Sequence, residues 1–223
     1  MRKALAAFIR THLLAIAWSL TVATIGLALF VWGETNHWQF VGISIYRLFP
    51  LFGLIAFSLF WSQYVIAALA QYTKAAPTAS GRYFGITSLL VFLALLLHPG
   101  LLSYQLWQDG FGLPPGSVLA HFVLPGLGWV VLLGMTSWVI FMFYLVTYKF
   151  HTIFQKRKWW EWFGYLGEIA MLAVFYHGFR LGDQLEVDWF RGVWLGYGII
   201  LIIILLYFHK DHLRRLMKRL VKK

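Results

Sequence analysis

The chain contains no cysteine and few charged residues, and both shortages narrow what it can be. Without cysteine it forms no disulfide, holds no cysteine-ligated iron–sulfur cluster and carries no haem attached through a Cys-x-x-Cys-His motif. Charged residues make up 12% of the 223 residues and hydrophobic residues 61%, whereas a soluble domain has about 25% charged residues. This composition predicts a protein that lies in a membrane.

Alternation of apolar and polar residues is also missing from the apolar segments. The stretches Leu89–Leu97 and Ile199–Phe208 are almost continuously apolar, whereas the strands of a membrane barrel alternate between the two kinds of residue. Because backbone groups in lipid must bond to one another, a helical bundle is the remaining architecture. The predicted fold class is an all-α polytopic membrane protein.

Six apolar runs are long enough to span a membrane, since about 20 helical residues cross the hydrocarbon core. They predict a six-helix transmembrane bundle with spans near 11–32, 48–70, 83–102, 121–147, 160–179 and 189–208. We expect Pro125, Gly126 and Gly128 to bend the start of the fourth span. No glycine-rich phosphate-binding loop joins a strand to a helix, so the chain is expected to lack a nicotinamide-binding domain.

The basic residues of the loops gather on one side of the predicted membrane. This side carries Arg2, Lys3, Arg10, Lys74, Arg82, Lys149, Lys156, Arg157, Lys158 and the basic residues of 210–223. The opposite side carries Arg47, Arg180 and Arg191. The positive-inside rule therefore predicts that both termini are cytosolic. The formal charge of +11 lies in short clusters between apolar spans, which favours contact with lipid headgroups over nucleic acid.

Two histidines, His98 and His177, lie near the ends of the third and fifth predicted spans. They follow Arg82 and Lys158 by 16 and 19 residues, which is roughly 24 Å and 28 Å of helix, so both reach the outer half of the membrane. A polar ring at membrane depth is costly and marks a candidate functional site. Two rings at matched depth suggest one shared ligand, such as the iron of a b-type haem. Because Pro99 follows His98, we expect this imidazole to lie at a kink or in a last helical turn.

Other interpretations of the histidines remain open. Each of the pair alone is also compatible with an interfacial residue bonded to a carbonyl or a lipid headgroup. The other six histidines are weaker candidates: His37 in an outer loop, His121 as a further ligand at the start of the fourth span, His12 and His151 as a cytosolic pair, and His209 and His212 in the basic tail. Zinc is disfavoured, because a catalytic zinc site needs three convergent protein ligands.

Short features around the two histidines resemble the ferric-reductase-like transmembrane domain family. They are Gly81-Arg82-Tyr83-Phe84-Gly85, which leads to His98, and Trp159-Trp160-Glu161-Trp162, which leads to Tyr176-His177. The family includes the haem subunit of the periplasmic methionine sulfoxide reductase system, the STEAP metalloreductases and the NADPH oxidases. The resemblance implies a haem-binding domain over 46–208, preceded by a first transmembrane helix and outer loop over 1–45 and followed by a basic cytosolic tail over 209–223.

The resemblance implies that His98 and His177 ligate one heme b. Two-haem members carry a second histidine pair about four helical turns nearer the cytosol. At that depth this chain has Phe84, Gly85, Phe163 and Gly164, which do not ligate iron. The implied protein is therefore a one-haem electron-transfer subunit of an oxidoreductase, in the bacterial inner membrane.

The resemblance also implies partners on both sides. Electrons would come from a cytosolic flavin or NAD(P)H reductase or from a membrane quinol, with FMN, FAD or a quinone as a further cofactor in the cytosolic half. They would pass to an outer acceptor: a periplasmic reductase, ferric ion or a small oxidant. The alternative is a membrane protein without haem, either a small transporter or an assembly factor. Glu168 and the glycine-containing fourth span are the features that point to it.

Three further charged residues are candidates. Arg47 resembles a basic position in the sulfoxide-reductase haem subunit, where a guanidinium pairs with a haem propionate; the alternative is an arginine that reaches to lipid headgroups. Arg180, three residues after His177, is a second candidate for a propionate. Glu168 is the only acid well inside a span. It is expected to be either a proton relay near a quinol or flavin, or a protonated carboxyl bonded to a neighbouring helix.

Overall fold

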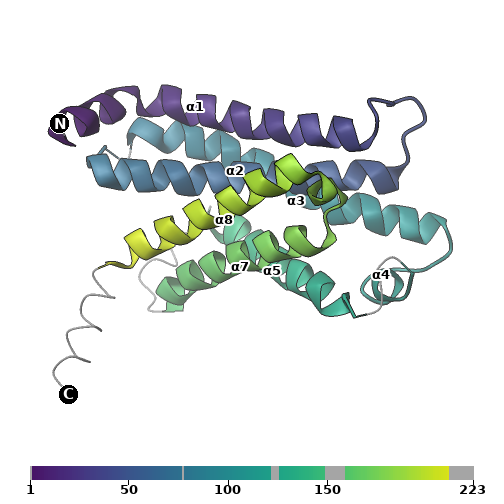
Figure 1. Ribbon diagram of the computed structural model, residues 1–223. Helices are drawn as coiled ribbons and strands as arrows, with labels where there is room; N and C mark the ends of the chain where they lie inside the picture. The colour runs from purple at the N-terminus through teal and green to yellow at the C-terminus, as the bar shows by residue number, and fades with distance from the viewer. Residues whose placement is uncertain (1, 77, 122–125, 149–158, 211–223) are drawn as a thin grey trace, which may run out of the picture.

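The computed structural model describes residues 2–76, 78–121, 126–148 and 159–210, and within these ranges every regular element is helical (Figure 1). The elements are α1 (Arg2–Thr35), α2 (Ile45–Thr73), α3 (Thr78–Gln108), α4 (Gly116–His121), α5 (Gly128–Tyr148), α7 (Trp159–Leu181), the 3-10 helix η1 (Asp183–Glu186) and α8 (Asp188–Phe208). The all-α fold class is therefore confirmed for the described part of the chain.

Five of these helices are long and apolar enough to cross a membrane: α1, α2, α3, α5 and α8. Large apolar side chains also cover their outer surfaces, among them Val22 (67% exposed), Leu89 (59%) and Ile199 (61%). Apolar surface of this extent suits acyl chains and not water. The chain is therefore an integral membrane protein. The 23-residue helix α7 corresponds to the predicted span 160–179, but it is less apolar and is not among the five.

The helices pack in two groups that α8 joins. Helix α2 packs mainly on α1 and α3, and α5 packs mainly on α7. Helix α8 crosses the face of the bundle in Figure 1 and contacts both α2 and α7. The start of α1 and the end of α8 lie at the same end of the bundle (Figure 1).

Hydrogen bonds between side chains and neighbouring helices hold this arrangement together. The hydroxyls of Thr21 (α1) and Tyr83 (α3) are 2.8 Å apart, and both residues are buried. The indole of Trp61 (α2) donates to the carbonyl of Tyr197 (α8) at 2.9 Å. Since lipid supplies no alternative partners, such bonds satisfy polar groups and also fix which helix faces meet.

Helices α7 and α8 approach closely because each places an aromatic ring over a glycine of the other. Trp194 of α8 lies over Gly178 of α7, where an added Cβ would be 2.7 Å from Trp194 Cζ2. Phe175 of α7 lies over Gly198 of α8, where an added Cβ would be 2.4 Å from Phe175 Cζ. Small residues at membrane helix interfaces allow this kind of approach.

We expect Gly198→Ala to lower the free energy of unfolding by about 1–3 kcal/mol, the typical cost of overpacking a close-packed site. The matched control is Gly196→Ala in the same helix, because a Cβ there meets nothing within 4 Å. Unfolding in mixed detergent micelles with increasing dodecyl sulfate measures both variants. Equal stability of the two variants would contradict the packing described here.

Two local predictions from the sequence are wrong. The fourth span was expected to begin at 121, but α5 begins at Gly128, and His121 ends the separate helix α4. Gly126 lies between them with φ +87°, a left-handed conformation that interrupts a helix; Pro125 lies outside the described residues. His98 was expected at a kink or last turn; the last turn is wrong, because α3 continues through Pro99 to Gln108.

Helix α3 continues because the missing N–H of Pro99 frees only one carbonyl, that of Leu95 one turn earlier. The indole of Trp138, on α5, donates to this carbonyl at 2.8 Å. The polar group that a proline leaves unpaired in a membrane helix is thus satisfied by a neighbouring helix. The same bond ties α3 to α5, and so joins the helices on which the candidate site is built.

Candidate functional site

The two membrane histidines make the same contact in two different helix pairs. His98 (α3) donates from Nδ1 to the carbonyl of Phe49 (α2) at 2.9 Å. His177 (α7) donates from Nδ1 to the carbonyl of Val130 (α5), also at 2.9 Å. Because a carbonyl only accepts, Nδ1 carries the proton in both rings, and Nε2 keeps the lone pair that binds metals.

The structure brings these two imidazoles near one another. Both side chains are partly buried. They are also close enough to interact electrostatically, although 79 positions separate them in the sequence. The pairing of His98 with His177 as ligands of one group, inferred from their depth alone, stays a prediction that this proximity allows.

A bond to a carbonyl was also expected of a merely structural histidine, so this contact alone does not distinguish the two interpretations. The matching of the contacts is more informative. Both rings use Nδ1, both carbonyls belong to the partner helix of a pair, and both Nε2 atoms carry the lone pair. This orientation, with Nδ1–H on a backbone carbonyl, is typical of metal-ligating histidines.

The donor set fits a haem better than a bare metal ion. Among the described residues, no three histidine, cysteine or acidic side chains gather to hold a metal ion. A zinc site would require such a cluster. A b-type haem needs only two axial imidazoles, because the porphyrin supplies the other four nitrogens, and it needs no cysteine.

The two arginines predicted to contact the cofactor each lie close along the chain to a residue of the two histidine–carbonyl contacts. Arg47 is exposed in the first turn of α2, two residues before Phe49, whose carbonyl binds His98. Arg180 is exposed in the last turn of α7, three residues after His177. Neither side chain is buried in the core, so both can reach a carboxylate at the membrane surface.

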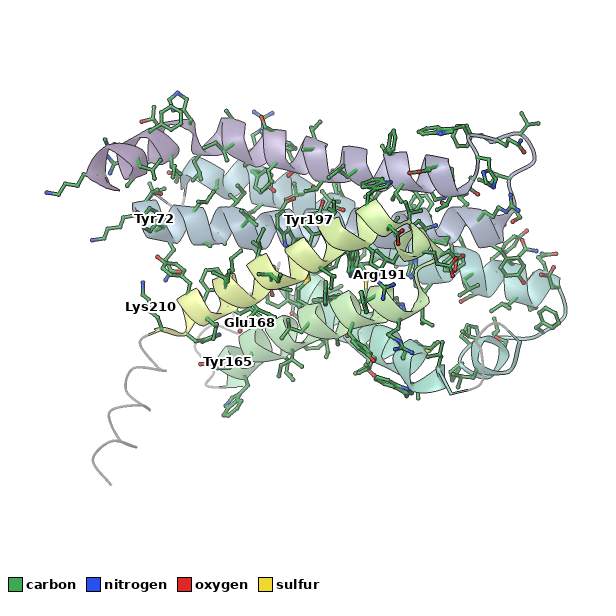
Figure 2. The ribbon with its side chains drawn as sticks, in the orientation of Figure 1. Tyr72, Tyr165, Glu168, Arg191, Tyr197 and Lys210 are labelled. Carbon is green, nitrogen blue, oxygen red and sulfur yellow. The ribbon has the colours of Figure 1, made fainter. Side chains whose placement is uncertain are left out.

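Glu168 forms a second polar contact on α7, with the end of α8 (Figure 2). Its Oε2 shares a hydrogen bond with His209 Nε2 at 2.6 Å, and the ring of Tyr165 stacks on His209 with centroids 5.2 Å apart. A bond from Glu168 to a neighbouring part of the bundle was one of the two expectations for this residue; its protonation and a role as proton relay stay predictions. His209, which was assigned to the basic tail, lies directly after α8 and contacts α7; residues 211–223 of the tail lie outside the described residues.

Of the remaining histidines, the structure describes the side chains of His12 and His37, and neither contacts the pair. His12 bonds through Nδ1 to Phe8 O in its own helix at 3.0 Å and is exposed. His37 is exposed in the outer loop. His121 ends α4, outside any of the five spans. The predicted partner of His12, His151, and the tail residue His212 lie outside the described residues.

Sequence reasoning missed the groups that hold the imidazoles: the carbonyls of Phe49 and Val130, and two glycines under the rings, Gly53 and Gly134. A sequence signal for the glycines is that each lies in the apolar span that precedes a histidine-bearing one. The carbonyls leave no such signal, since every residue has one. Comparisons of the chain with protein-family models, curated proteins and solved structures found no match.

Proposed function

We propose that this chain is a b-type haem membrane protein that carries electrons outward, with His98 and His177 as the axial ligands of one haem. The observation that carries the proposal is the matched state of the two imidazoles. Each holds its Nδ1 proton on a backbone carbonyl at 2.9 Å and keeps Nε2 available. Two such rings on different helices, near one another in the outer half of a membrane protein, fit bis-imidazole ligation of a porphyrin.

The proposed topology has six spans with both termini in the cytosol. Helix α7 is the sixth span, since its 23 residues exceed the roughly 20 that cross the hydrocarbon core. An even number of spans agrees with the start of α1 and the end of α8 lying at one end of the bundle (Figure 1). The excess of lysine and arginine at that end supports its placement in the cytosol.

A bound haem would supply one-electron redox chemistry, and the residues of this chain would hold and tune it. His98 and His177 fix the iron from two helix pairs. Arg47 and Arg180 provide positive charge for the propionates at the outer surface. The apolar helices around the site keep water away, which affects the potential.

The proposed partners follow the direction of transfer. The donor is a cytosolic flavin reductase or a membrane quinol, with a flavin or quinone in the cytosolic half, and the acceptor is a periplasmic reductase, ferric ion or a small oxidant. The protein would then act as the electron-transfer subunit of a ferric-reductase-like oxidoreductase in a bacterial inner membrane.

The proposal is tested by purifying the full chain in detergent from haem-replete cells. We expect one non-covalently bound haem per chain and a reduced-minus-oxidised spectrum of a low-spin b-type cytochrome. Haem content is measured as the pyridine haemochrome. Well-folded protein that contains no haem, even after incubation with added haemin, would overturn the proposal in favour of a haem-free membrane protein.

The role of Arg47 gives a separate prediction. Loss of its positive charge in Arg47→Gln should stabilise the ferric form, and lower the midpoint potential by up to about 59 mV, which is a tenfold change in a one-electron equilibrium. The control is Arg191→Gln, which removes an outer arginine that lies over the ring of Phe179, 5.2 Å from its centroid. A redox titration that gives equal potentials for both variants would assign Arg47 to lipid headgroups.

A further inference from the structure

Each of the two imidazoles lies against a glycine of the partner helix. A Cβ built on Gly53 (α2) would be 2.8 Å from Cε1 and 2.9 Å from Nδ1 of His98. A Cβ built on Gly134 (α5) would be 2.5 Å from both Cε1 and Nδ1 of His177. Carbon atoms of real side chains essentially never approach this closely. Neither ring could occupy its present position above any residue other than glycine.

The glycine and the carbonyl that binds the ring are related in the same way on both sides. Phe49 precedes Gly53 by four residues, and Val130 precedes Gly134 by four. In an α-helix the carbonyl of residue i accepts from the N–H of residue i+4, so each carbonyl serves both the glycine and the imidazole. We call Phe49, Gly53 and His98 the first half-site, and Val130, Gly134 and His177 the second half-site.

The two half-sites also match in their place along the chain. In the first, the carbonyl and the histidine are 49 residues apart, and in the second they are 47 residues apart. Both consist of a helix pair in which the earlier helix supplies the carbonyl and glycine, and the later helix supplies the histidine. The half-sites thus agree in the spacing of carbonyl and glycine, in the separation of carbonyl and histidine, and in the order of the two helices. Close helix packing does not require this agreement, since packing alone would not place an acceptor one turn before each glycine.

Building on the proposed function, we infer that Gly53 and Gly134 are positioning residues that set the depth and rotation of the two axial imidazoles. A methyl group at either position would push the ring away from the helix and stretch or break the bond from Nδ1 to the carbonyl. That bond makes the imidazole a stronger donor to iron and fixes its orientation. The glycines would thereby tune the iron without touching it.

The experiment compares Gly53→Ala and Gly134→Ala with two matched controls in the full-length protein. The controls are Gly85→Ala (α3) and Gly167→Ala (α7), which lie in the histidine-bearing helices and have nothing within 4 Å of an added Cβ. The readouts are haem content, the low-spin electron paramagnetic resonance spectrum of the ferric form, and the midpoint potential.

We expect the controls to match the wild type. The two test variants should show shifted g-values or a high-spin fraction, and a higher midpoint potential, because a weaker imidazole donor stabilises ferric iron less. The change should be at least tenfold in the one-electron equilibrium, or about 59 mV. Gly134→Ala should have the larger effect, since its Cβ would lie closer to the ring.

The outcomes separate this inference from the proposed function. A wild-type protein that binds no haem would contradict both the proposed function and the role of the glycines. A wild type with a bis-imidazole spectrum, together with test variants that are indistinguishable from the controls, would overturn only the role of the glycines.

A glycine variant that does not fold is resolved by a second substitution. Gly134→Ala combined with His177→Gly removes the ring that the new methyl group would meet, and the analogous pair is Gly53→Ala with His98→Gly. If the combined variant folds and the single one does not, the contact with the imidazole is the cause. If both fail to fold, the glycine serves helix packing only, and the inference is wrong.

Discussion

Replacing His98 or His177 by alanine is expected to remove the low-spin b-type spectrum and to lower the haem content of the purified protein by at least about tenfold. Loss of a residue that merely supports a metal ligand already costs 10–100-fold in affinity, and loss of the ligand itself should cost at least as much. The two variants should behave alike, because the two half-sites are built alike. The pyridine haemochrome and the reduced-minus-oxidised spectrum measure the effect.

The controls for these variants are His12→Ala and His37→Ala. Both residues are exposed and belong to neither half-site: His12 lies on α1 and His37 in the outer loop. Both should keep the wild-type spectrum. A full low-spin spectrum in His98→Ala and in His177→Ala would show that the iron takes its ligands from elsewhere, and would remove the basis of the proposed function.

A rescue experiment distinguishes a lost ligand from a damaged fold. In His98→Gly and His177→Gly the side chain is removed down to Cα, and free imidazole can enter the space that it leaves. We expect millimolar imidazole to restore the low-spin spectrum of each variant, whereas a misfolded protein would not respond. Wild-type protein should be unaffected, since its axial positions are already filled.

The sequence predicts which two histidines could share a ligand, but not how their rings are held. The depth of His98 and His177 could be counted from basic residues at the cytosolic ends of two spans, because a membrane helix rises by a fixed distance per residue. This reasoning needs no knowledge of neighbouring helices. The carbonyls and glycines of the half-sites depend on which helices pair and in which register, and one-dimensional spacing does not contain that information.

Contacts between helices explain what the sequence did not predict near Pro99 and His209. Pro99 was expected to end or kink α3, as proline does in an isolated helix, but Trp138 of α5 satisfies the carbonyl that the proline frees. His209 was grouped with the basic residues that follow it, but it bonds to Glu168 on another helix. In both cases a contact between helices decided the local structure, in agreement with the general precedence of tertiary contacts over local preference.

The bond between Trp138 and Leu95 joins the two half-sites and gives the last prediction. Leu95 lies three residues before His98 on α3, and Trp138 lies four residues after Gly134 on α5. In Trp138→Phe an aromatic ring remains but the indole N–H is lost, so the Leu95 carbonyl is left without this hydrogen-bond donor in an apolar environment. We expect this to lower the free energy of unfolding by about 1–3 kcal/mol. Trp129→Phe is the control, because Trp129 lies on the same helix and is 51% exposed.

The double variant tests why the bond exists. In Pro99→Ala the backbone N–H of residue 99 is restored and can donate to the Leu95 carbonyl within α3, as in an ordinary helix. Trp138→Phe should therefore destabilise the Pro99→Ala protein much less than the wild type. We expect a coupling free energy between the two substitutions of about 1 kcal/mol or more, which lies within the usual range for contacting residues. Unfolding in mixed micelles of all four proteins completes the cycle. If the two substitutions are additive, Trp138 stabilises the protein through its ring alone, and the link between the half-sites is not the hydrogen bond.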